Sequence, residues 1–186
     1  MSQIPEQSWK QAYEAFPQFK QAGLSEKQAT ELMQAIVRNE LYNYDAADKS
    51  ADDDVRAGRT PLIAKAHLKK EEDITLGIEQ LSTKGVKDRE AEYPKQVNFK
   101  GHEEQALLDP ANAPTLVAAT LAHNIEMYRR HHVPITEESL AYSYNPSDKR
   151  RILPTSSDVN SSQHVANVMH QLAIIRHEVE ARPDER

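Results

Sequence analysis

The sequence predicts a mainly α-helical protein with a single domain. Residues that favour helices are common, while β-branched clusters are few and the 186 residues include only 5 glycines. Hydrophobic residues make up 38% and charged residues 28% of the chain, a balance typical of a folded globular domain. A chain of this length buries about two thirds of its unfolded surface, which suits one core better than two.

Composition also excludes several partners and chemistries. The net charge is −6 and the basic residues are spread along the chain, so we expect no nucleic-acid partner. The absence of cysteine excludes disulfides, thiolate zinc sites and cysteine nucleophiles. No apolar run approaches the ~20 residues that cross a bilayer, and the first residues lack the pattern of a signal peptide. We therefore expect a protein made in the cytoplasm, with no membrane insertion.

The first 24 residues predict a packing helix of the same domain. Trp9, Tyr13 and Phe16 recur at helical spacing, and Pro17 is expected to end or bend this helix. Ser25 with Gln28 then forms the pattern of a capping box, which begins the next helix. We expect residues 25–181 to form the main part of the domain and residues 182–186 to form a flexible tail.

One carboxylate, Glu40, interrupts the apolar face of this second helix. At about 100° per residue, the face comprises six residues, namely Ala29, Leu32, Met33, Ile36, Val37 and Tyr44. Glu40 projects near its middle, where a carboxylate must find donors or take up a proton through a raised pKa. That is how a general acid is made. The alternatives are that the helix frays after Val37, or that an Arg or Lys pairs with Glu40 structurally.

The stretch after Tyr44 is acidic and predicts a surface loop, with one short helix near residues 62–68. Calcium is the one cofactor that its carboxylates suggest, but their spacing lacks the alternation and central glycine of an EF-hand loop. A solvated acidic loop is therefore preferred. Residues 74–81 follow, with β-branched residues around Gly77, and predict an extended piece or small β-hairpin beside a cleft.

The second half of the chain predicts three further helices. An apolar stripe from Leu116 to Tyr128 is typical of a central core helix, and Thr136 is expected to cap a short helix that stops before Pro146. A last helix with Val165 and Leu172 on one face completes the core. The 8 histidines are scattered without a ligand pattern, so structural or surface roles suffice and we expect no metal site.

Three segments resemble, in order, the motifs of goose-type lysozymes and lytic transglycosylases. The helix ending at Glu40 resembles their catalytic-Glu helix, and residues 77–81 resemble a Gly-Leu-Met-Gln-type turn. Residues 141–145, Ala-Tyr-Ser-Tyr-Asn, resemble an Ala-Tyr-Asn-Ala-Gly-type helix end. The resemblance spans roughly residues 25–175 and implies a lysozyme-like catalytic domain over residues 25–181, with the hairpin beside the cleft.

The resemblance also implies roles for individual residues. Glu40 would protonate the glycosidic oxygen between the two amino sugars of peptidoglycan, and Gly77 and Gln80 would line the glycan groove. Tyr144 would orient Glu40, and Asn145 would hold the following loop or a sugar. The alternatives are helix termination and core packing for Tyr144 and Asn145, and an exposed strand position for Gln80.

The second catalytic group separates two reactions. An inverting hydrolase needs a second carboxylate roughly 6.5 to 9.5 Å from the first, and Asp45 and Asp48 are the candidates. A lytic transglycosylase needs none, because the 6-hydroxyl of the sugar attacks. Four departures from the transglycosylase pattern favour hydrolysis: Leu41 follows the Glu, Glu79 replaces an apolar residue, Pro146-Ser147 replaces Ala-Gly, and the interval from Glu40 to Gly77 holds a long acidic insertion.

With no signal peptide or wall-anchoring module, the chain is most similar to muramidase effectors that bacteria inject through type VI secretion, or else to a phage endolysin. An effector would act on peptidoglycan in the periplasm of a target bacterium, with secretion machinery and a cognate immunity protein as partners. The rival class is a non-catalytic helical binding module, such as an immunity or adaptor protein, whose acidic surface would suit a basic partner.

Overall fold

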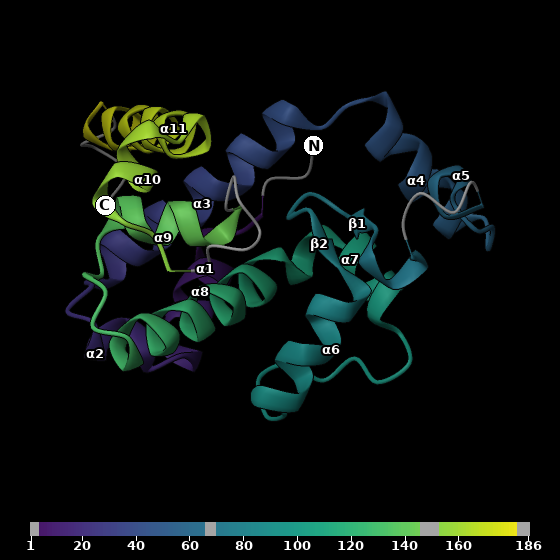
Figure 1. Cartoon of the computed structure of the whole chain (residues 1–186), viewed down its shortest axis with the longest axis horizontal. Helices are drawn as coiled ribbons and strands as arrows, with labels where there is room; N and C mark the ends of the chain where they lie inside the picture. Colours follow the sequence, from purple (N-terminus) through teal and green to yellow (C-terminus); the bar gives the residue numbers. More distant parts are fainter. Residues whose placement is uncertain (1–3, 66–69, 146–152, 182–186) are drawn as a thin grey trace.

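The protein is mainly helical and carries one small antiparallel sheet, as the sequence predicts. The computed structural model describes residues 4–65, 70–145 and 153–181. Figure 1 shows the arrangement, in which the long helix α8 crosses the molecule between the other helices. The elements are α1 (Glu6–Ala15), α2 (Gln18–Gln21), α3 (Glu26–Asn43), α4 (Ala46–Arg56), α5 (Leu62–Lys65), η1 (Glu71–Asp73), β1 (Thr75–Leu76), β2 (Leu81–Ser82), α6 (Thr83–Glu92), α7 (Glu103–Leu108), η2 (Pro110–Asn112), α8 (Ala113–Arg130), α9 (Glu137–Tyr144), α10 (Ser156–Ser161) and α11 (Gln163–Glu180).

The N-terminal segment forms two short helices that pack on the core. Pro17 lies between α1 and α2, as its effect on the helical backbone predicts. Trp9, Tyr13 and Phe16 are all buried, and α1 packs against α3 and α8. The Phe16 ring meets the Tyr93 ring edge-on, with centroids 5.3 Å apart, which joins this segment to the end of α6.

Helix α3 begins at the predicted capping box and carries Glu40 in its last turn. The Gln28 amide donates to Ser25 Oγ at 3.2 Å, and the Ser25 amide donates to Gln28 Oε1 at 3.1 Å. The helix continues to Asn43, so the alternative that it frays after Val37 is wrong. Its apolar face packs against α8, α9 and α11.

The expectation of a loop after Tyr44 is wrong, because residues 46–56 form helix α4. Asp45 is its N-cap and accepts from the amides of Ala47 and Asp48 at 2.7 and 3.0 Å. One face of α4 is buried through Ala51 and Asp52, which gives the helix a packing surface despite its acidity. The predicted short helix appears as α5; residues 66–68 of that prediction lie outside the described part of the chain.

The predicted extended piece is a two-stranded hairpin. Thr75 pairs with Ser82 and Leu76 with Leu81, leaving residues 77–80 as the turn. In Figure 1 the hairpin lies beside α7 and above α6, and it also packs against α4.

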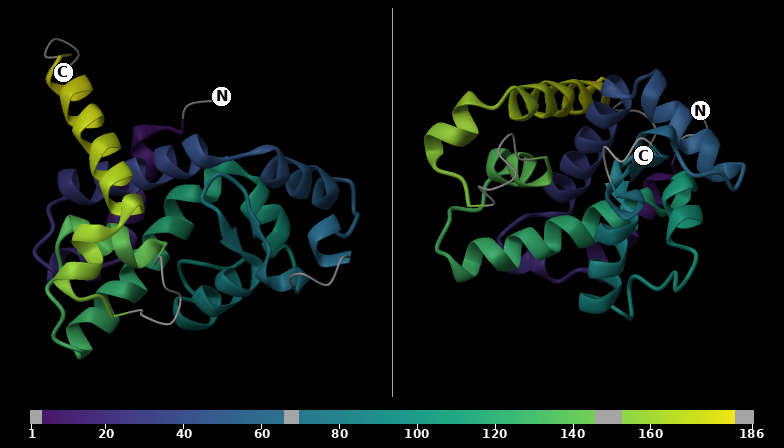
Figure 2. Two further views of the ribbon diagram at one scale, coloured as in Figure 1. Left: turned by 45° about the horizontal axis from the view of Figure 1, so that its top comes forward. Right: turned by 45° about the vertical axis from the view of Figure 1, so that its right-hand side comes forward.

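The later helices follow their predicted apolar stripes. Leu116, Val117, Leu121, Ile125 and Tyr128 of α8 are all fully buried. Thr136 caps α9, and α11 packs against α3 and α9. Figure 2 shows the C-terminal end of α11 projecting from the rest of the molecule, where residues 177–181 are exposed. The predicted tail, residues 182–186, and Pro146-Ser147 lie outside the described residues.

No helix in the described part of the chain combines the length and apolarity needed to cross a bilayer.

Candidate functional site

Glu40 is a buried acid whose pKa is raised to about 7. Glu40 is only 6% exposed, and this burial is the largest cause of the rise in its pKa. The charge of Asp48 raises the pKa further, while a hydrogen bond from Asn39 lowers it. Glu40 is therefore protonated in a large fraction of molecules at neutral pH, as a general acid must be.

Within residues 4–65, 70–145 and 153–181, no Lys or Arg forms an ion pair with Glu40. The basic group within reach is His164 at the start of α11, whose Nδ1 lies 3.7 Å from Glu40 Oε1. Burial lowers the pKa of His164, while the backbone of Ala141 works in the opposite direction. A neutral imidazole does not neutralise a carboxylate. Among the described residues, the structural ion pair of Glu40 with an Arg or Lys is therefore absent, and His164 does not replace it.

The two candidate second carboxylates differ in their surroundings. Asp45 is exposed and its Oδ1 accepts from two amides at the start of α4, which explains its presence without any catalytic role. Asp48 Oδ2 accepts from the Asp45 amide at 3.1 Å, completing the capping box. Asp48 is also the carboxylate whose charge acts on Glu40. Of the two, Asp48 is the better candidate for a partner acid.

The turn of the hairpin is tightly braced. Gly77 has φ +70°, and a Cβ there would lie 1.9 Å from the carbonyl oxygen of Leu107. Its amide donates to Asp52 Oδ1 at 3.1 Å. This position therefore requires glycine, both for its backbone conformation and for the close approach of α7.

Gln80 lies in the turn rather than on an exposed strand, and its side chain is half-buried. Its Nε2 donates to the Gly77 carbonyl at 2.8 Å, and its Oε1 accepts from Thr75 Oγ1 at 3.0 Å. The backbone φ of 51° is unusual for a residue with a side chain. Gln80 thus holds the turn in shape, and a contact with glycan remains a prediction.

Tyr144 joins the end of α9 to the hairpin. Its hydroxyl donates to the main-chain oxygen of Glu79 at 2.5 Å, and a role in orienting Glu40 stays a prediction. Burial is the main cause that raises the pKa of Tyr144, and the charges of Glu79 and Glu40 add to it. Asn145 follows as the exposed C-cap of α9.

Glu79 is an unexpected member of the site. It is fully buried, and neither carboxyl oxygen has a hydrogen-bond partner in the described part of the chain. Burial raises its pKa well above the ordinary value, and the charges of Asp52 and Asp109 contribute. Burial therefore favours the protonated, neutral form of this side chain, which explains how an acid can occupy a position where the resemblance expects an apolar residue.

Asn39 and His164 are the site residues that the sequence did not reveal. Asn39 Nδ2 lies 3.4 Å from Glu40 Oε1 and 3.2 Å from His164 Nδ1. Asn39 directly precedes Glu40, and this adjacency was the one available signal. His164 lies on a distant helix and has no ligand-like spacing to mark it.

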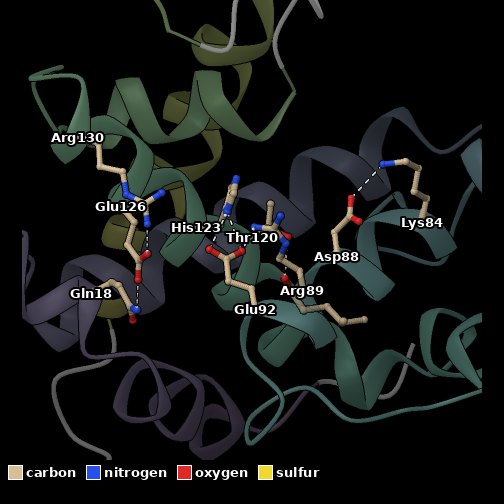
Figure 3. A network of polar contacts seen from close by, with 10 residues as sticks. Gln18, Lys84, Asp88, Arg89, Glu92, Thr120, His123, Glu126 and Arg130 are labelled. Atoms are coloured by element: carbon tan, nitrogen blue, oxygen red, sulfur yellow. Dashed lines mark hydrogen bonds and ion pairs between the residues drawn. The ribbon is translucent and has the colours of Figure 1, made fainter.

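Several polar groups away from Glu40 form contacts of their own. Figure 3 shows a network between α6 and α8, in which His123 Nδ1 lies 2.7 Å from Glu92 Oε2 and Arg89 Nη1 lies 3.1 Å from the same oxygen. A depression of about 370 Å³ elsewhere contains none of the predicted site residues; it is lined by Lys70, Glu72, Thr83, Lys87 and Glu104. The described residues contain no group of three or more side chains arranged to hold a metal ion.

Comparison with protein-family models, curated proteins and solved structures finds no match for this chain. The geometry around Glu40 therefore carries the functional argument.

Proposed function

We propose that this protein is a muramidase-like glycoside hydrolase that cleaves the β-1,4 bond between MurNAc and GlcNAc in peptidoglycan. One observation carries the proposal: Glu40 is a buried carboxyl at the end of a helix, with a pKa of about 7. Such a group holds a proton at neutral pH and can give it to a leaving group, which an ordinary exposed glutamate cannot do efficiently. The lysozyme-like character of the fold is part of this proposal.

The proposed chemistry begins with proton transfer from Glu40 to the glycosidic oxygen as its bond to the sugar C1 breaks. Water attacks C1 from the opposite face, and Asp48 takes the proton that this water loses. Both products leave as free sugars, and the proton on Asp48 exchanges with solvent while Glu40 is reprotonated. Burial serves the first step because it makes the ionised form of Glu40 costly, so the carboxyl still carries a proton to donate at neutral pH.

The hairpin supports Glu40 in this scheme. Tyr144 holds the turn through the Glu79 carbonyl, and Gly77 permits the close contact with α7. The backbone of this turn, Gln80 and the exposed Asn145 are proposed to line the path of the glycan.

A lytic transglycosylase is the second candidate, and one observation favours it. Asp48 already accepts a hydrogen bond from the Asp45 amide at the start of α4. Because this Asp48 oxygen is already engaged in capping α4, it is less available to activate a water. In that reaction the sugar 6-hydroxyl attacks C1 and leaves a 1,6-anhydro end.

The test uses purified peptidoglycan. Clearing of its turbidity by the wild type should fall at least ~100-fold in Glu40→Gln, the usual scale for loss of a general acid. Equal clearing by both proteins, or none by either, would refute catalysis by Glu40. Binding without clearing would favour the non-catalytic helical module.

Two aspartate variants and the released fragments separate the reactions. Asp48→Asn should stop hydrolysis, while its control Asp45→Asn should keep it, because asparagine also caps helices well. Mass spectrometry of the fragments distinguishes reducing ends from 1,6-anhydro ends.

Delivery to a target bacterium is a separate part of the proposal. An effector or endolysin that acts on the wall should lyse cells when a signal peptide directs it to the periplasm, and should leave them intact when it stays in the cytoplasm. Glu40→Gln is the control for the exported form. Lysis from the cytoplasm would contradict the periplasmic site of action.

A further inference from the structure

A main-chain carbonyl determines how the Asn39 amide is oriented. Asn43 Nδ2 lies 2.9 Å from the Asn39 carbonyl oxygen, which can only accept a hydrogen bond. The NH2 group of Asn43 therefore faces Asn39, and it also lies 3.3 Å from Asn39 Oδ1. Since Oδ1 accepts on that side, the NH2 group of Asn39 must be the one that faces Glu40 and His164.

The Asn39 amide then assigns the roles of its two neighbours. An amide NH2 has two hydrogens and accepts none, so both Glu40 Oε1 at 3.4 Å and His164 Nδ1 at 3.2 Å act as acceptors. For His164 this means a neutral ring with its proton on Nε2, a buried atom that has no hydrogen-bond partner among the described residues. For Glu40 it means that Oε1 is the oxygen without a proton.

We infer that Asn39 and His164 are positioning residues that keep the acidic proton of Glu40 on Oε2, the oxygen left to meet the glycosidic oxygen. The catalytic meaning of this inference rests on the proposed function. Asn39 is 1% exposed and lies beside Glu40 in α3, whereas His164 comes from α11. The position of the proton on Glu40 therefore also depends on the packing of α11 against α3.

Other titratable groups interact electrostatically with Glu40. The charge of Asp48 in α4 raises its pKa, and Glu40 together with Glu79 of the hairpin raises the pKa of Tyr144 in α9. Both aspartate charge and burial oppose ionisation of Glu40. The Asn39 hydrogen bond is the contact that favours the carboxylate, so its loss should raise the pKa of Glu40.

The experiment is an NMR titration of the ¹³C-labelled Glu40 carboxyl, assigned by its absence in Glu40→Gln. His164→Leu removes the acceptor that holds the Asn39 amide, and should raise the pKa of Glu40 by about half a pH unit or more. His164→Asn places Oδ1 where Nδ1 was, so the pKa should stay within about 0.2 units of the wild type. His170→Asn, on the exposed side of the same helix, is the matched control and should change nothing.

Asn39→Ala removes the donor itself and should raise the pKa at least as much as His164→Leu. If that variant does not fold, Asn43→Ala serves instead, because it frees the Asn39 amide to turn. On peptidoglycan, the alkaline limb of the pH–activity profile should move upward by the same amount as the pKa.

Two results would overturn the inference. One is an unchanged or lowered pKa of Glu40 in both His164→Leu and Asn39→Ala (or Asn43→Ala in its place), and the other is a shift in His164→Asn as large as that in His164→Leu. The titration needs no substrate, so it decides the inference even where peptidoglycan is not cleaved. Absence of cleavage by the wild type would count against the proposed function alone.

Discussion

Replacement of Glu40 by glutamine is expected to stabilise the protein at alkaline pH while it abolishes cleavage. The pKa of Glu40 is about 7 in the folded state against an ordinary value of 4.5. Between these values the folded protein binds a proton that the unfolded chain has released. Stability is therefore greatest below pH 4.5 and falls as pH rises toward 7. Glutamine stays neutral throughout and escapes this loss.

The size of the effect follows from the shift. The rise from 4.5 to about 7 is about 2.5 units, and each unit is worth 1.36 kcal/mol, so the variant should gain about 3 kcal/mol above pH 8. Below pH 4 the wild-type side chain is also neutral, and the two proteins should be equally stable to within about 0.5 kcal/mol.

Urea unfolding of both proteins at pH values from 4 to 9 measures this difference. Glu79 and the other acids titrate in both proteins, so the subtraction isolates Glu40. Glu14→Gln, at an exposed position of α1, is the matched control and should differ from the wild type by less than about 0.5 kcal/mol at every pH. A Glu40→Gln difference that stays constant with pH, or that increasingly favours the wild type, would refute the argument.

Three further changes test the framework around the site by thermal or urea unfolding. Gly77→Ala should lower the free energy of unfolding by more than about 2 kcal/mol, since the new Cβ would meet the Leu107 carbonyl. Gly58→Ala, at a position with φ +66° and open space around it, should lower the free energy of unfolding by only about 1 kcal/mol. Equal losses would contradict the close contact. Glu79→Met should stabilise the protein above pH 5 and keep clearing activity, because it removes a buried acid whose pKa is raised; destabilisation at pH 8 would contradict this. Tyr44→Phe should lower the free energy of unfolding by about 1 to 2 kcal/mol, because the buried Asp52 carboxylate of α4 loses its 2.6 Å hydrogen bond from the Tyr44 hydroxyl. An unchanged free energy of unfolding would show that this bond is unimportant.

Under the proposed function, stability and activity make opposite demands on the side chain at position 40. A neutral side chain would make a more stable protein at the pH of most cells, yet it would have no proton to give. The same burial that raises the pKa of Glu40 lowers the stability of the fold, which is a common cost of a functional group placed in a core.

Local signals in the sequence predicted most of the helices. The capping boxes at Ser25 and Thr136 and the apolar stripe of α8 depend on residues within one or two turns of each other, so they can be recognised without knowing the fold. The acidic stretch after Tyr44 misled the prediction, because composition alone hid both the cap at Asp45 and the buried face at Asp52. That face is buried by tertiary packing against α7 and the hairpin, where the Gly77 amide donates to Asp52 Oδ1.

By itself, the sequence determined that the protein is mainly helical and that Glu40 falls on an apolar helix face. Only the tertiary structure decided what Glu40 can do there. Its pKa depends on burial and on Asp48, its hydrogen bond on Asn39, and its second neighbour is His164 from the far end of the chain. Helix formation is a local event that nearby residues specify, whereas proton affinity is set by every group that packing brings within a few ångströms.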